Sequence, residues 1–164
     1  MFLQRLLKPG PAKAAGEKLY ADLGASDTPD GRFEVYTLHV LLVLERLRAI
    51  GPSAAATAQV YFDTYLGGLD NGLRELAVGD LAVAKTMRKL AEAFYGRGKA
   101  FDAALEALPD PAPLHALLTR TVFGGNADGD PTPFARRLLE VRDILAGTPT
   151  ETLLAGVLPP LEAR

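Results

Sequence analysis

The two histidines, His39 and His115, are the side chains of this sequence with the most versatile chemistry. Helical metal sites pair a histidine with a carboxylate or a second histidine three or four positions away. Neither histidine has such a neighbour. We therefore predict that each one is hydrogen-bonded within or at the edge of the core.

The loop at residues 124–130 has a partial calcium-binding pattern. Asn126, Asp128 and Gly129 match the third, fifth and sixth positions of a calcium loop. The first position would be a glycine and the twelfth Ala135, so the pattern lacks a carboxylate and the bidentate glutamate. A plain turn is the better prediction.

Other catalytic motifs are missing from the sequence. There is no cysteine, and the serines, Ser26 and Ser53, do not lie in a nucleophile elbow. Neither a glycine-rich phosphate loop nor a dinucleotide fingerprint is present. We predict no catalytic residue, no cofactor and no bound metal, and therefore a protein that is not an enzyme.

Basic residues gather in residues 80–99, where five of them accompany two acidic ones, although the net charge of the chain is −2. A charged outer helix face explains this pattern, because cations near a helix C-terminus are favourable. A binding site for a negative partner also explains it. One basic helix in a mildly acidic chain does not indicate DNA binding.

Helices must position these residues. The 164 residues fit one domain, and every apolar run has helical length or spacing, without the alternation of strands. We expect an all-α, single-domain bundle of about seven helices with mostly antiparallel neighbours and the 32–50 helix at its centre. The apolar part of that helix is shorter than the roughly 20 residues of a membrane span.

Proline, glycine and capping residues delimit the expected helices. They cover residues 11–24, 32–50, 53–66, 70–78, 80–108, 111–122 and 132–145, followed by a short helix after a capping box at 148–151.

Glycines interrupt the middle of the chain. We expect a helix that ends near Leu66, a tight corner at Gly67 and Gly68, and a short helix that Asp70 caps. Asp80 would cap the next helix. The apolar stripe expected on that helix consists of Leu81, Ala84, Leu90, Ala91 and Phe94.

Residues 1–10 are expected to form a short segment before a helical domain at 11–164. Arg5 and Lys8 stand among apolar residues, and the order of charges does not fit a signal peptide. Two interpretations remain open: a terminus packed on the body, or an amphipathic segment that touches a bilayer surface.

Three groups of residues stand in a specific order: Asp70, Leu73, Arg74 and Glu75, then Val78, Gly79, Asp80, Leu81 and Lys85, then Ala93, Phe94, Tyr95, Gly96 and Arg97. This order resembles the signature of the ubiquinol-cytochrome c chaperone family. The block RFEVYTLHVLLVLERLR at 32–48 is similar to the N-terminal apolar helix of that family. The resemblance covers most of residues 15–123 and does not extend to the 140s onward.

The resemblance implies an assembly chaperone. The family is associated with biogenesis of the respiratory cytochrome bc complex, and its members bind newly made cytochrome b. The implied partners are unassembled cytochrome b, the ribosome near its exit tunnel and the inner-membrane surface. A chain without a presequence is expected to work in the cytoplasm, at the periphery of the inner membrane.

The position of the signature and the local charge suggest a client-binding surface at residues 65–101. Its expected polar residues are Asp70, Arg74, Glu75, Lys85, Lys89 and Arg97, and its expected apolar contacts are Tyr65, Tyr95 and Phe101. The alternative is that the signature mainly preserves a buried corner and its caps.

Two other classes of function remain open. A small-molecule binder would use Tyr36 or His39 in an apolar pocket, and a deep closed cavity beside His39 would favour it. A ribosome- or lipid-surface adaptor would use Arg5, Lys8 and the basic helix.

Overall fold

The computed structural model describes residues 23–25, 28–75, 80–126 and 128–160, and this part of the chain is helical. It contains α3 (Pro29–Ile50), the 3-10 helix η1 (Pro52–Ala54), α4 (Ala55–Glu75), α5 (Asp80–Glu106), α6 (Ala112–Thr121), α7 (Thr132–Gly147) and α8 (Thr150–Leu154). The predicted all-α fold is confirmed, with six α-helices in the described residues. The expected segment 1–10 and nearly all of the expected helix 11–24 lie outside them.

Helix α3 begins three residues earlier than predicted. The hydroxyl of Thr28 accepts a hydrogen bond of 3.1 Å from the backbone N–H of Gly31, and a proline fills the first helical position. The helix ends at Gly51, which has a φ of 99° that side chains other than glycine avoid. The expected central helix therefore has a defined cap at each end.

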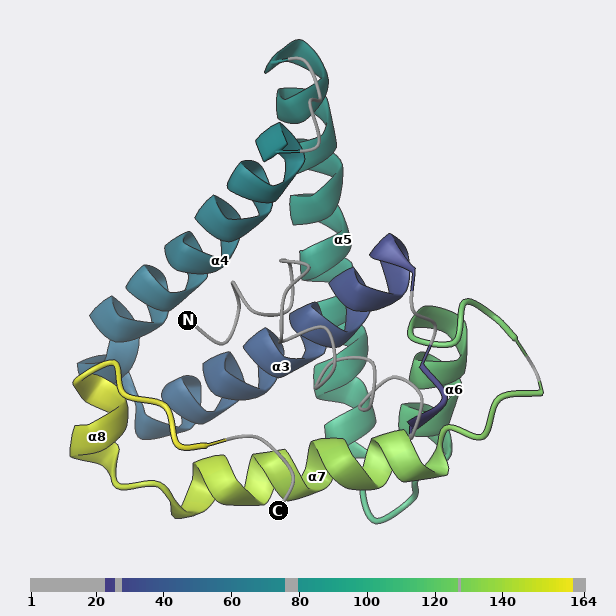
Figure 1. The fold of residues 1–164 in the computed structure, drawn as a ribbon. Coiled ribbons are helices and arrows are strands. Elements are labelled where there is room, and N and C mark those ends of the chain that lie inside the picture. Colours follow the sequence, from purple (N-terminus) through teal and green to yellow (C-terminus); the bar gives the residue numbers. More distant parts are fainter. Residues whose placement is uncertain (1–22, 26–27, 76–79, 127, 161–164) are drawn as a thin grey trace.

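Helix α3 is buried on nearly all sides. Figure 1 shows α4 and α5 rising from it as two sides of a triangle, with α7 crossing below and α6 at one end of α7. Its contacts are with α4, α5 and α7. The fully buried side chains of α3 include Val35, Tyr36, Leu38, Val40 and Leu42. A helix covered in this way explains the apolar run in the sequence.

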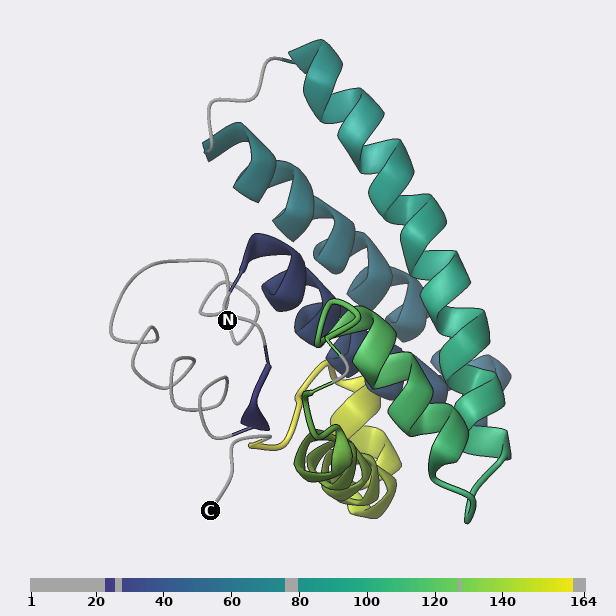
Figure 2. The same ribbon diagram turned by 90° about the vertical axis from the view of Figure 1, so that its right-hand side faces the viewer.

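Helices α4 and α5 form a hairpin whose far end extends beyond α3 in both views (Figures 1 and 2). We call this end, residues 66–75 and 80–90, the arm. Among its described side chains only Leu69 and Val83 are buried. No helix in the described part of the chain is long and apolar enough to cross a membrane.

Helix α4 runs without interruption through Gly67, Gly68 and Gly72. The predicted corner at Gly67 and Gly68 is therefore wrong, and so is the separate helix capped by Asp70. A glycine inside a helix costs about 1 kcal/mol relative to alanine. Tertiary packing outweighs this cost, because the flanking residues Tyr65 and Leu69 bury their side chains on the same helix.

Gly68 lies beside Tyr36 of α3. A β-carbon at this position would lie 3.5 Å from the hydroxyl oxygen of Tyr36, which is an ordinary van der Waals contact. The helix contact at this level therefore does not require a glycine.

Short polar contacts begin the later helices. The carboxylate of Asp110 accepts a hydrogen bond of 3.0 Å from the N–H of Ala112 at the start of α6, and Asp130 accepts one of 2.9 Å from Thr132 at the start of α7. The predicted capping box before α8 is wrong. The hydroxyl of Thr148 donates instead to the carbonyl of Ile144 in α7, at 2.7 Å.

Candidate client-binding surface

Helix α5 has two opposite faces, and each follows a spacing of four and three residues. The inner face packs on the protein and contains Val83, Met87, Leu90, Phe94, Arg97 and Phe101. The outer face is exposed at every position, and we call it the outer stripe: Leu81, Lys85, Arg88, Glu92, Tyr95 and Lys99. This geometry corrects the predicted apolar stripe, since Leu81 is 91% exposed and Ala84 is also exposed.

An aromatic cluster holds α5 against α4. The ring centroid of Phe94 lies 5.0 Å from that of Phe62 and 5.2 Å from that of Tyr65, and the ring of Tyr36 on α3 lies at a centroid distance of 4.9 Å from Tyr65, with the two planes tilted by 50°. Such pairs contribute about 0.5–1.5 kcal/mol each beyond the area that they bury. The cluster lies at the base of the arm and fixes where the arm extends away from the rest of the described helices, which we call the body.

Tyr65 lies at the centre of this cluster and is fully buried. Its hydroxyl shares a hydrogen bond of 2.9 Å with the hydroxyl of Thr37, and burial raises the pKa of Tyr65 to about 12. Phe101, further along α5, is also fully buried. Neither side chain is accessible to a client, so we remove both residues from the candidate surface.

Burial also raises the pKa of Tyr36, whose hydroxyl has no hydrogen-bond partner among the described residues. The hydroxyl faces Gly68, as described above. Desolvation without a compensating hydrogen bond favours the neutral phenol. Tyr36 is therefore a core residue of the α3–α4 contact.

Arg97 belongs to the inner face of α5, so it is not a free polar residue of the expected client-binding surface. Its guanidinium donates hydrogen bonds of 2.8 and 2.6 Å to the two carboxylate oxygens of Glu34 on α3. The Glu34 side chain is 9% exposed, and the hydrogen bonds to Glu34 raise the pKa of Arg97. Arg97 therefore links α5 to α3 through a bidentate ion pair.

Asp70 and Arg74 pair with each other on the surface of α4. The Nε atom of Arg74 lies 2.7 Å from Oδ2 of Asp70, at the spacing of one helical turn. Both remain accessible, whereas the side chains of Glu75 and Asp80 lie outside what the structure describes, and with them the predicted cap at Asp80.

Lys85 and Lys89 are exposed on α5, together with Arg88. Among the described side chains no carboxylate forms an ion pair with any of the three. Tyr95 is 67% exposed, although one edge of its ring contacts Phe62 at a centroid distance of 6.3 Å. The structure thus brings two predicted cations and one predicted aromatic residue onto one helix face.

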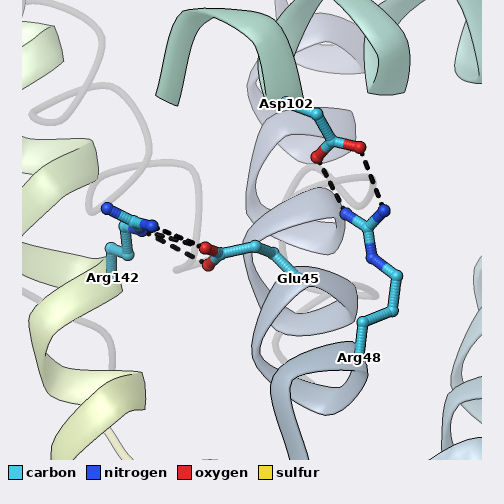
Figure 3. Close-up of polar contacts among 4 residues, drawn as sticks. All are labelled: Glu45, Arg48, Asp102 and Arg142. Carbon is cyan, nitrogen blue, oxygen red and sulfur yellow. Dashed lines mark hydrogen bonds and ion pairs between the residues drawn. The ribbon is translucent and has the colours of Figure 1, made fainter. Parts of the chain in front are cut away.

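Sequence reasoning missed the ion pairs that hold α3 in place (Figure 3). Glu45 of α3 accepts hydrogen bonds of 2.7 to 3.3 Å from Arg142 of α7, and Arg48 donates two of 2.8 and 3.0 Å to Asp102 of α5. The partners are 97 and 54 residues apart in the chain, so no local spacing signals them. These ion pairs link α3 to α7 and to α5.

His39 is 7% exposed, and its Nδ1 atom donates a hydrogen bond of 2.8 Å to the carbonyl of Val35. Burial lowers the pKa of His39, which favours the neutral ring. The prediction of a hydrogen-bonded core histidine is confirmed for His39. Among the described residues no group of three potential ligands could hold a metal ion.

A hollow of about 410 Å³ lies between α6 and α7. Its lining is mostly apolar, with Leu108, Leu114 and Leu139 beside His115 and Arg136. His39 is not among the lining residues, so this hollow is not the cavity beside His39 that would favour a small-molecule binder.

The family model of the ubiquinol-cytochrome C chaperone matches residues 21–160. The chain therefore belongs to the ubiquinol-cytochrome c chaperone family, as the resemblance in the sequence predicted. The match includes the region from the 140s onward, which that resemblance did not reach.

A solved structure supports the assignment. The chain is similar to the Cbp3 homolog from Brucella abortus, known from a crystal structure, with 34% sequence identity and a TM-score of 0.77. The similarity covers 97% of this chain and 87% of that one. A search of curated proteins finds no match.

Proposed function

We propose that this protein is an assembly chaperone that binds newly made cytochrome b and promotes biogenesis of the respiratory cytochrome bc complex. The observation that carries the proposal is the family match over residues 21–160, with the outer stripe of α5 in the middle of it. The client contacts are Lys85, Lys89 and Tyr95 on α5, with the Asp70–Arg74 pair on the neighbouring α4.

The chemistry of this surface suits temporary binding. Exposed cations attract an acidic segment over about 10 Å at moderate salt, and their contribution to the association rate is larger than to the final affinity. Leu81 and Tyr95 add small apolar contacts without a deep pocket. A chaperone must also release its client, and a narrow, mostly polar contact allows this.

We place the activity at the cytoplasmic face of the inner membrane, since the proposed client is a membrane protein that must be met before assembly. We also propose contact with the ribosome near its exit tunnel, because newly made cytochrome b is first met there. Cosedimentation of the full chain with ribosomes and with anionic vesicles tests these two locations. Sedimentation that persists after Lys85, Arg88 and Lys89 are changed to glutamate would exclude α5 as the attachment surface.

A deletion strain tests the function. We expect loss of the assembled bc complex and a reduced amount of cytochrome b, both restored by the wild-type chain. Normal amounts of the complex in the deletion strain would refute the proposed function.

Rescue by charge-reversal variants tests the site. The double variant Lys85→Glu with Lys89→Glu should restore the complex poorly. The matched control, Arg120→Glu with Arg136→Glu, reverses two exposed cations of α6 and α7 and should restore it fully. Equal rescue by the two double variants would show that α5 is not part of the client-binding surface, and it would leave the proposed function unchallenged.

A further inference from the structure

The outer stripe is a straight line of exposed side chains. Its residues follow one another at intervals of four and three, which keeps them on one helix face over about 27 Å at 1.5 Å per residue. Leu81 and Tyr95 lie near its two ends, and cations lie between and beyond them. This spacing is the one that a second helix matches when it packs alongside.

Gly96 lies next to Tyr95 on the exposed side of α5. Its φ is not positive, and a β-carbon there would meet nothing within 4 Å. Gly98, two residues further on and on nearly the opposite face of α5, differs because a β-carbon there would lie 3.3 Å from Cδ2 of Leu41. Packing on α3 explains Gly98, whereas no contact among the described residues explains a poor helix former at Gly96.

We propose that the outer stripe binds an acidic α-helix of the client, which packs closely against the bare backbone at Gly96. The inference rests on the proposed function and specifies the chemistry of the client segment. Lys85, Arg88 and Lys99 of the stripe face this helix, with Lys89 exposed beside them and a single carboxylate, Glu92, among them. The bound helix presents acidic residues to the cations and a small or apolar residue to Tyr95 and Gly96.

Gly67 on α4 provides the matched control. It is also exposed, and a β-carbon there would likewise meet nothing within 4 Å. Its neighbours one turn away on the same face are Asp63, which accepts a hydrogen bond from Gln59, and Asp70, which is paired with Arg74, so this part of α4 lacks the excess of cations that the outer stripe has. The two glycines therefore differ in charge surroundings and not in helix geometry.

Two other occupants fit the stripe less well. A membrane-binding helix has a continuous apolar face bordered by cations, whereas here the cations separate Leu81 from Tyr95. An RNA backbone would meet Glu92 in the middle of the stripe, where like charges repel. A helix can place a cation opposite Glu92, and lipid phosphates and RNA cannot.

Photo-cross-linking in cells identifies the occupant. The cross-linker p-benzoylphenylalanine replaces Tyr95 in the full-length chain and, as a control, Val60, which is 66% exposed on α4. We expect position 95 to give an adduct with an acidic helical segment of cytochrome b at about ten times the yield of position 60. An adduct with lipid, RNA or a non-acidic segment would overturn the inference, and so would equal yields or no adduct at position 95.

Substitution of the two glycines tests the close approach. Gly96→Ala and Gly67→Ala should each raise the melting temperature by about 2 °C. Only Gly96→Ala should lower the cytochrome b recovered with the tagged chaperone, by about tenfold. Undiminished recovery with Gly96→Ala would overturn the inference. The proposed function would survive that result, because it fails only if the deletion strain assembles the complex normally.

Discussion

The arm at the far end of α4 and α5 and the body, which is made of the other described helices and the remaining parts of α4 and α5, differ in how much each part buries. In the body, α3 is tied to α5 and α7 by bidentate ion pairs and surrounded by core side chains. In the arm, Leu69 and Val83 are the buried side chains among the described ones. The body therefore carries the stability, and the arm can change its surface without unfolding the chain.

The largest expected difference between these regions comes from truncating one apolar side chain in each. Phe101→Ala removes a fully buried ring from the body and should lower the free energy of unfolding by about 3–5 kcal/mol. Leu81→Ala, at the exposed start of α5, should change it by less than about 0.5 kcal/mol. Urea denaturation measures both, and similar losses would contradict the division into body and arm.

A second comparison removes one carboxylate charge from the body and one from the outer stripe. Glu34→Gln breaks the bidentate pair with Arg97 and should cost about 1–3 kcal/mol, because Glu34 is buried and its partner is partly buried. Glu92→Gln, on the exposed stripe, should cost about 0–0.5 kcal/mol. Equal stabilities of these two variants in urea denaturation would show that the Glu34 pair contributes nothing to the body.

The pH dependence of stability sharpens the description of the body. Burial holds the pKa of His39 below its ordinary value, so the unfolded chain binds a proton there that the folded chain does not. Stability from this histidine is present above pH 6.5 and falls as the pH drops below it, with a slope of up to about 1.4 kcal/mol per pH unit.

The measurement is urea denaturation between pH 7 and pH 5. His39→Gln should flatten the slope. An unchanged slope in His39→Gln would mean that His39 keeps an ordinary protonation equilibrium after folding.

The smallest expected effect compares two helical glycines. Gly72→Ala in the arm should stabilise the protein by about 0.5–1 kcal/mol, because nothing lies within 4 Å of the added carbon. Gly98→Ala in the body should lose this gain, since Leu41 must move aside. Thermal unfolding measures both, and an equal gain at both positions would show that α3 and α5 are loosely packed at this level.

Much of the fold could be predicted from residue patterns. Helix α3 follows from its apolar run and Gly51, and α6 and α7 follow from the acidic and proline residues at their starts. The continuity of α4 could not be predicted in this way, because contacts with α3 compensate for Gly67 and Gly68. Local propensity is a weak guide wherever tertiary packing decides.

The candidate site was predicted in part. Lys85, Lys89 and Tyr95 are exposed as expected, and the spacing of α5 also contained the signal that Phe101 is buried, since it lies seven residues from Phe94 on the inner face. The role of Arg97 depends on Glu34, which is 63 residues away in the chain. No local pattern encodes such a partner.

The ties of α3 have a consequence for the synthesis of this protein. Its contacts with Arg142 and Leu145 of α7 span 97 and 99 residues, so most of the chain must leave the ribosome before all sides of this apolar helix are covered. Until then, apolar side chains of α3 are exposed on the nascent chain, and such exposed surface favours aggregation. A member of a chaperone family thus passes through an unprotected stage in its own synthesis.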